Sequence, residues 1–376
     1  MSPIYGPNPP ASHARAEAHP PSGQLSSGIK MYVNAVYYLN QHVYNNQPPS
    51  TLKLGIISHV FYAFAKLERD GTVQLGDQWA DSQMAVDGQR GCLGSFAALK
   101  QQHPHLKLIL SIGGGNGSEH FAAVASHYSR REKFGGTARA LVDHCGLDGI
   151  DIDWESPCTA QEGQDYSELI ATARRHLPTP QFLLTSAWPA GAWALQHIDV
   201  ALAQRYLDYI NLMTYDFSGP WVDAAGHHAQ LWSPQHPHND AAKLSGHSAV
   251  CYLRSRGVLA HKLILGIPAY GRSFVGARGV GDAFTGHGGS DGAFEYKELP
   301  RPGSYEQVDQ TACAAFTVGG EEGFVSYDNP QTVSTKAGYV VSTGLGGLFY
   351  WTGTGDGQGP KSLVETGFKT LHGQIA

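Results

Sequence analysis

The sequence is poor in charge and in cysteine, and it has no long hydrophobic run. Charged residues make up 15% of the 376 residues, against about 25% in an ordinary soluble domain. No window approaches the roughly 18 consecutive apolar residues of a membrane span. The 26 Lys+Arg and 32 Asp+Glu residues give a formal net charge of −6 without a basic cluster. These features argue against a membrane-spanning protein and against a dedicated nucleic-acid binder.

The five cysteines are odd in number and show no C-x-x-C spacing; they are Cys92, Cys145, Cys158, Cys251 and Cys313. Neither a disulfide framework nor a zinc site is therefore expected. Four histidines lie close together in a Pro-containing segment without H-E-x-x-H spacing: His227, His228, His236 and His238. That context favours a surface loop over a metal site. We expect free thiols, no metal and no cofactor.

Residues 1–29 are polar and Pro-rich, and they lack the apolar core of a signal peptide. We expect a disordered tail there. Together with the free thiols, the absence of a visible signal peptide favours a cytoplasmic location. A lost leader or a non-classical route of secretion stays open.

Eight short apolar runs recur along the rest of the chain, separated by segments long enough for helices. Runs such as KLILSIGG are almost continuously apolar, which is typical of strands buried on both faces of a parallel sheet. We expect strands at 31–39, 56–65, 106–112, 147–154, 182–187, 209–213, 263–269 and 347–351. Eight strands alternating with helices predict an α/β fold, a (β/α)8 barrel over residues 30–376.

One connection is much longer than the others. About 75 residues separate Tyr270 from Gly347, far more than one loop and one helix require. This segment contains a strand-like FVSYD and a helix-like stretch at 330–343. The spacing predicts a small α+β insertion at 272–340, between strands seven and eight.

The densest chemical signal is LDGIDIDWES at residues 147–156. It contains Asp148, and then Asp151, Asp153 and Glu155 on one face of the expected strand, because side chains alternate along a strand. Neighbouring carboxylates repel one another, so a purely structural role fits badly. Binding of Mg²⁺ or Ca²⁺ is possible in principle. Repulsion also raises a carboxyl pKa, which suits Glu155, at the C-terminal mouth, to donate a proton near neutral pH.

The segment DGIDIDWE resembles the DxxDxDxE signature of family 18 glycoside hydrolases, the chitinases and their relatives. Other segments resemble further strand motifs of that family in the same order: VYYLN (36–40), SHVFYAFA (58–65), KLILSIGGG (107–115), NLMTYDFSG (211–219), GIPAYGRSF (266–274) and GGLFYW (346–351). The resemblance runs from about residue 31 to 370. It is closest to the bacterial-type chitinases that also occur in fungi, whose insertion domain lies between strands seven and eight.

The resemblance implies a substrate-assisted, retaining mechanism with an oxazolinium intermediate. Glu155 is then the general acid and base. Asp153 turns to orient the acetamide of the substrate, Asp151 holds the shared proton, and Tyr215 hydrogen-bonds the acetamide.

The resemblance also implies a sugar-binding surface. Trp351 is expected to form its floor, and six further contacts are expected from Tyr37, Phe64, Trp188, Met213, Asp216 and Arg272. Two positions depart from the family pattern. Ser156 follows the catalytic glutamate, where an aromatic residue is usual, and Trp188 replaces a small residue and could narrow the cleft.

The resemblance therefore predicts a monomeric chitinase that acts on chitin or chito-oligosaccharides. Two alternatives remain open. One is an endo-β-N-acetylglucosaminidase of N-glycans, against which the MTYD segment and the insertion argue. The other is a chitin-binding lectin without activity, although such proteins typically lack the acid that Glu155 supplies.

Overall fold

The computed structural model describes residues 31–373, and residues 32–373 belong to one compact unit. The tail predicted at 1–29 lies outside the described residues. Within the described part of the chain, no helix is both long and apolar enough to cross a membrane.

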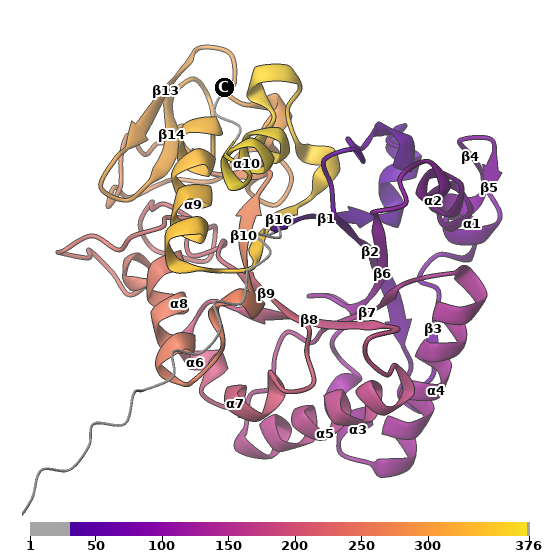
Figure 1. Ribbon diagram of the computed structural model, residues 1–376. Helices are drawn as coiled ribbons and strands as arrows, with labels where there is room; N and C mark the ends of the chain where they lie inside the picture. Colours follow the sequence, from indigo (N-terminus) through magenta and orange to yellow (C-terminus); the bar gives the residue numbers. More distant parts are fainter. Residues whose placement is uncertain (1–30, 374–376) are drawn as a thin grey trace, which may run out of the picture. The chain divides into compact units, whose positions relative to one another are not determined.

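Eight parallel strands close into a barrel (Figure 1). They are β1 (Val33–Leu39), β2 (His59–Leu67), β6 (Lys107–Gly113), β7 (Gly149–Asp153), β8 (Leu183–Pro189), β9 (Tyr209–Met213), β10 (Leu263–Pro268) and β16 (Gly347–Trp351). The barrel is closed because β1 pairs in parallel with both β2 and β16. The predicted (β/α)8 barrel is confirmed, and the strand ends differ from the predicted ones by only a few residues.

Helices surround the barrel on its outer side (Figure 1). The longer ones are α2 (Gly91–Gln102), α4 (Tyr128–Cys145), α5 (Ala160–His176), α8 (Gly246–Ser255), α9 (Pro330–Thr343) and α10 (Leu363–Leu371). In α5, Thr159 caps the N-terminus by accepting from the backbone N–H of Glu162. Tyr166, Leu169, Ile170 and Ala173 then recur at helical spacing and are buried. Such a stripe packs the helix on the strands, so the main core lies between barrel and helices.

A second core fills the barrel itself. It contains Tyr37, Phe61, Ile109, Ile264 and Phe349, each 1% exposed or less. Bulky side chains from several strands thus close the interior, as is usual for this fold. Ligands can consequently reach the strands only at their ends.

The long connection between β10 and β16 contains a five-stranded antiparallel sheet followed by α9. The sheet runs in the order β12 (Ala293–Glu295), β11 (Tyr270–Phe274), β15 (Phe324–Tyr327), β14 (Ala314–Gly319) and β13 (Ser304–Asp309). Strand β11 begins two residues after β10 ends. The insertion sheet therefore grows directly out of a barrel strand at the C-terminal end of the barrel.

Candidate active site

A cavity of about 440 Å³ opens at the C-terminal ends of the barrel strands. Asp153, Met213 and Trp351 line it, and each is the last residue of its strand. The segments after β7, β8 and β9 complete the wall with Glu155, Ser156, Cys158, Trp193, Tyr215 and Asp216. The cavity therefore has the position at which barrel enzymes carry out their chemistry.

Strand β7 separates its apolar and acidic residues between two faces, as predicted. Trp154 points outward and stacks on Phe121, with ring centroids 5.5 Å apart and an interplanar angle of 7°. Asp151 and Asp153 are buried toward the barrel interior, and Glu155 reaches the cavity. Asp148 belongs to neither group, because it accepts from Lys100 Nζ at 2.5 Å at the start of the strand. Only three of the four carboxylates therefore belong to the site.

Asp151 sits at the bottom of the site among hydroxyl donors. It accepts from the hydroxyls of Tyr37 at 2.8 Å, Ser111 at 2.8 Å and Thr185 at 2.7 Å, and Asn211 Nδ2 lies at 3.4 Å. Burial raises the pKa of Asp151, and the three hydroxyl donors offset part of this rise by stabilising the ionised form. Of the three carboxyls of the site, Asp151 is thus the one whose ionised form is best stabilised by hydrogen bonds.

Ser111, Thr185 and Asn211 were not predicted from the sequence. The signal that could have found them is polarity on inward positions of otherwise apolar strands. Each occupies such a position, on β6, β8 and β9 respectively, and all three are fully buried. Buried polar side chains require partners, and here the shared partner is Asp151.

Asp153 has a different environment from Asp151. It is 3% exposed, and its Oδ1 has no hydrogen-bond partner among the described residues. Burial, followed by the negative charges of Glu155 and Asp151, raises the pKa of Asp153 well above the usual range. Asp153 is therefore the member of the pair that holds a proton more readily, and among the described residues no hydrogen bond at its Oδ1 opposes rotation of the side chain.

Glu155 stands at the mouth of this row of carboxyls. Its backbone N–H donates to Ser118 Oγ at 2.9 Å. Gly115 lies beside the Glu155 carboxyl. A Cβ at this glycine would be in van der Waals contact with Glu155 Oε1, at 3.7 Å. The surrounding protein, and then the charge of Asp216, raise the pKa of Glu155. A carboxyl that keeps its proton in a cavity open to solvent can act as a general acid.

Aromatic side chains form one wall of the cavity. Trp351 packs against Tyr37 and Phe64, with ring centroids 5.2 Å and 5.9 Å away. Tyr37 and Trp351 line the cavity, whereas Phe64 supports Trp351 from the side. Tyr215 also lines it, and burial together with the charges of Asp153 and Glu155 raises its pKa well above the usual tyrosine range. Its hydroxyl therefore remains a donor.

Asp216 and Arg272 form a two-point ion pair at the edge of the cavity. Arg272 Nε donates to Asp216 Oδ1 at 2.8 Å, and Nη2 donates to Oδ2 at 2.9 Å. The guanidinium also lies over the rings of Trp221 and Tyr270, 5.0 Å and 5.2 Å from their centroids. Tyr270 lines the cavity and was not identified from the sequence.

The structure contradicts the prediction that Trp188 contacts sugar. Trp188 is 1% exposed and donates from Nε1 to the hydroxyl of Tyr166, on the helix side of β8, at 2.6 Å. The neighbouring residues Ala187 and Pro189 face the cavity instead. Alternation along the strand is the physical reason, because Thr185 faces inward and Trp188 lies three positions further.

The prediction of a surface loop is wrong for two of the four histidines. His227 is 7% exposed and His228 is fully buried, because the insertion sheet and α9 cover this part of the loop. Between residues 31 and 373, no three His, Cys, Asp or Glu side chains are grouped as metal ligands.

Known proteins resemble the chain over most of its length. Residues 33–356 match the family described as Glycosyl hydrolases family 18. Chitinase 1 of Aphanocladium album is 35% identical over 367 residues, which cover 91% of this chain and 86% of that protein. The structure of the Ostrinia furnacalis Group IV chitinase in complex with allosamidin has a TM-score of 0.83 at 26% identity, covering 92% and 100% of the two chains. The Cycas revoluta GH18 chitinase in complex with (GlcNAc)3 has a TM-score of 0.78 at 27% identity, covering 89% and 98%.

Proposed function

Because the chain belongs to glycosyl hydrolase family 18, we propose that it is a chitinase, hydrolysing β-1,4-linked polymers or oligomers of N-acetylglucosamine. The observation that carries the proposal is the row of Asp151, Asp153 and Glu155, which leads from the barrel interior into a cavity walled by Trp351. The chitinase names of its relatives support the same substrate class.

In the proposed reaction, Glu155 donates its proton to the glycosidic oxygen. The acetamido carbonyl of the substrate attacks the anomeric carbon, which breaks the glycosidic bond and forms an oxazolinium ion; substrate-assisted enzymes of this kind need no protein nucleophile. Glu155, now ionised, takes a proton from water, and the water opens the oxazolinium with net retention. The raised pKa of Glu155 supports the first step.

The Asp153–Asp151 pair stabilises the positive charge that develops on the oxazolinium. Asp153 passes its proton to Asp151 as it rotates away to accept from the acetamide N–H, so the proton of the pair then lies on Asp151. The unpartnered Oδ1 of Asp153 supports this rotation. Tyr215 donates to the acetamide oxygen, which holds the carbonyl in its attack geometry.

The sugar ring stacks on Trp351, since pyranose rings present apolar C–H faces to aromatic rings. Tyr37 and Phe64 hold this indole in place, and Met213 also lines the cavity. The Asp216–Arg272 pair offers charged hydrogen-bonding groups to sugar hydroxyls at the edge.

The test compares Glu155→Gln with the native chain on a defined chito-hexamer, with product anomers followed over time. We expect the variant to bind chito-oligosaccharide and to lose nearly all hydrolysis. Glu168→Gln, an exposed position on α5 outside the cavity, is the matched control and should retain turnover. Near-native turnover by Glu155→Gln would refute the mechanism.

The same assay separates the alternatives. Cleavage of a high-mannose glycoprotein without cleavage of chitin oligomers would indicate an endo-β-N-acetylglucosaminidase. Sugar binding by the native chain without turnover at any pH would indicate a lectin.

A further inference from the structure

His228 lies beside the Asp216–Arg272 pair, in the loop that follows β9. Its ring is fully buried, and its Nδ1 is 3.6 Å from Asp216 Oδ1. The ring also packs on Tyr270, with centroids 5.1 Å apart. Neither ring nitrogen has a hydrogen-bond partner among residues 31–373. The Asp216 carboxylate is thus a charged group that faces the ring at close range.

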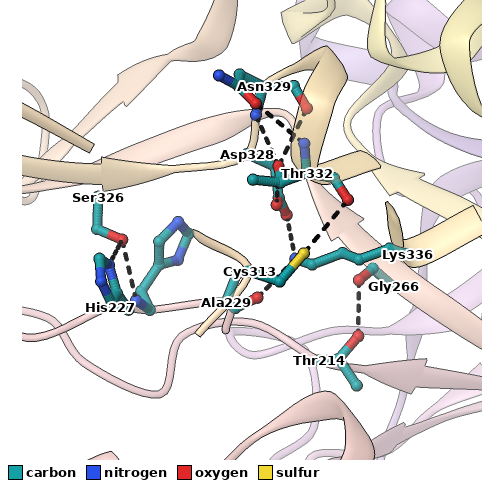
Figure 2. Close-up of polar contacts among 11 residues, drawn as sticks. Thr214, His227, Ala229, Gly266, Cys313, Ser326, Asp328, Asn329, Thr332 and Lys336 are labelled. Atoms are coloured by element: carbon teal, nitrogen blue, oxygen red, sulfur yellow. Dashed lines mark hydrogen bonds and ion pairs between the residues drawn. The ribbon is translucent and has the colours of Figure 1, made fainter. Parts of the chain in front are cut away.

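The backbone on both sides fixes the position of this ring. The carbonyl of His228 accepts from the N–H of Phe217, the residue after Asp216, at 3.0 Å. The next carbonyl, of Ala229, accepts from Lys336 Nζ at 2.6 Å, and Lys336 also pairs with buried Asp328 at 2.5 Å (Figure 2). The loop is therefore tied to the Asp216 segment at one end and to α9 at the other.

A buried imidazole without hydrogen bonds is an unfavourable choice for a core position. An apolar side chain of similar size would fill the same space without leaving polar atoms desolvated. Polar groups in this condition concentrate at functional positions. His228 lies next to the charged Asp216–Arg272 pair at the edge of the cavity, which suggests a functional reason for a histidine at this buried position.

The charges around His228 define its protonation. Asp216 faces it from the β9 loop, Arg272 and Tyr270 from β11, and Asp328 from the segment before α9. Burial lowers the pKa of His228, Asp216 opposes this shift, and Arg272 adds to it. The ring is accordingly neutral at neutral pH, and its Nδ1 faces Asp216 Oδ1 at 3.6 Å, beyond hydrogen-bond distance.

We propose that His228 is a positioning residue for the glycosidase reaction, which packs against the Asp216 carboxylate and keeps it in its two-point pair with Arg272, at the edge of the cavity that Glu155 lines. This role rests on the proposed function of Glu155 as the acid. Asp216 is ionised at the pH of the reaction. Although burial raises its pKa, His228 and Arg272 together bring the pKa of this carboxyl far below the usual range. The negative charge of Asp216 in turn raises the pKa of Glu155.

The first test measures kcat/KM against pH on a fluorogenic chito-oligosaccharide. His228→Leu removes the ring nitrogen that faces Asp216 and keeps the bulk, whereas His228→Asn keeps a polar N–H group at this position. We expect the basic limb of His228→Leu to move to lower pH by on the order of one unit, and that of His228→Asn to stay near the native position. His227→Leu, in the same loop, is the matched control, and its basic limb should not move.

A purely structural role would lower turnover at every pH and leave the basic limb in place. That result in His228→Leu would overturn the proposal.

The second test does not depend on turnover. Imidazole NMR signals of His228 are identified by their loss in His228→Asn and are titrated in the native chain and in Asp216→Asn. Because the charge of Asp216 raises the pKa of His228, we expect a lower His228 pKa in Asp216→Asn. An unchanged titration would show that the two side chains are not coupled and would refute the proposal. If coupling is present but the native chain turns over no chito-oligosaccharide, the proposed function fails while the pairing stands.

Discussion

Replacing Thr185 by valine should move the acidic limb of the pH profile without changing the shape of the cleft. Thr185 is fully buried and donates to Asp151 Oδ1 at 2.7 Å. Valine has the same shape but no hydroxyl, so Asp151 loses one of three close O–H donors. Asn211 Nδ2, at 3.4 Å from the same oxygen, is then its main remaining partner there.

The expected size follows from the strength of a hydrogen bond to a charged group. Such a bond contributes about 1.5–3 kcal/mol, and one pH unit corresponds to about 1.4 kcal/mol. The donor stabilises the ionised form, so its removal raises the pKa of Asp151. Because the Asp151–Asp153 pair must keep one negative charge for catalysis, the acidic limb should move to higher pH by about 1–2 units.

The assay is kcat/KM for a soluble chito-oligosaccharide measured between acidic and neutral pH. Ser186→Ala is the matched control, since Ser186 is the next residue on β8, faces outward and donates to the carbonyl of Ile152 at 2.5 Å. We expect Ser186→Ala to lose stability and to keep the native acidic limb. An acidic limb that is unchanged in Thr185→Val would refute the assignment of Asp151 as the ionised partner.

Three further predictions concern stability and geometry. Lys336→Met should lower the free energy of unfolding by about 3–5 kcal/mol, because buried Asp328 loses its counter-charge. In urea denaturation, the double variant with Asp328→Leu should recover much of this loss. A Lys336→Met variant whose stability lies within about 1 kcal/mol of the native value contradicts the argument. Trp188→Ala should lower the free energy of unfolding by about 3–5 kcal/mol and leave KM for chito-oligosaccharides unchanged. A raised KM without a loss of stability would show that Trp188 contacts the sugar. Gly266→Ala should lower the free energy of unfolding and also lower kcat by ~10²-fold, because its Cβ would lie 2.7 Å from the Leu212 carbonyl oxygen, 2.8 Å from Phe349 Cζ and 2.9 Å from Tyr215 Cε1. Unchanged steady-state kinetics would show that Tyr215 tolerates displacement.

The features that the sequence could predict are those set by local periodicity. Alternation along IDIDWE places Asp151, Asp153 and Glu155 on one face without knowledge of the fold. The same alternation, counted from Thr185, would also have placed Trp188 outside the barrel. The prediction for Trp188 was wrong because the sequence of β8 does not show which of its alternate residues face inward. That is set by the register with β7, in which Thr185 lies opposite Asp151.

Other features depend on contacts between distant segments and could not be read locally. The burial of His228 results from Ser326, which lies 98 residues further along the chain, and from the anchoring of Ala229 by Lys336, 107 residues away. Glycines and prolines near this loop are typical of a surface segment. Nothing in that composition indicates that a later sheet covers it.

The immediate passage from β10 into β11 limits how this enzyme can be shortened or recombined. Arg272 is carried by the sheet of the insertion, where it pairs in register with Ser326 of β15 and Ala293 of β12. Deleting the whole insertion would remove a charged group of the cleft, so the insertion is not an exchangeable module. The outer hairpin of β13 and β14 lies furthest along the sheet from β11. Even so, Asp309 pairs with His227 and the carbonyl of Ala312 accepts from the N–H of Leu231, so shortening this hairpin would release the loop that follows β9.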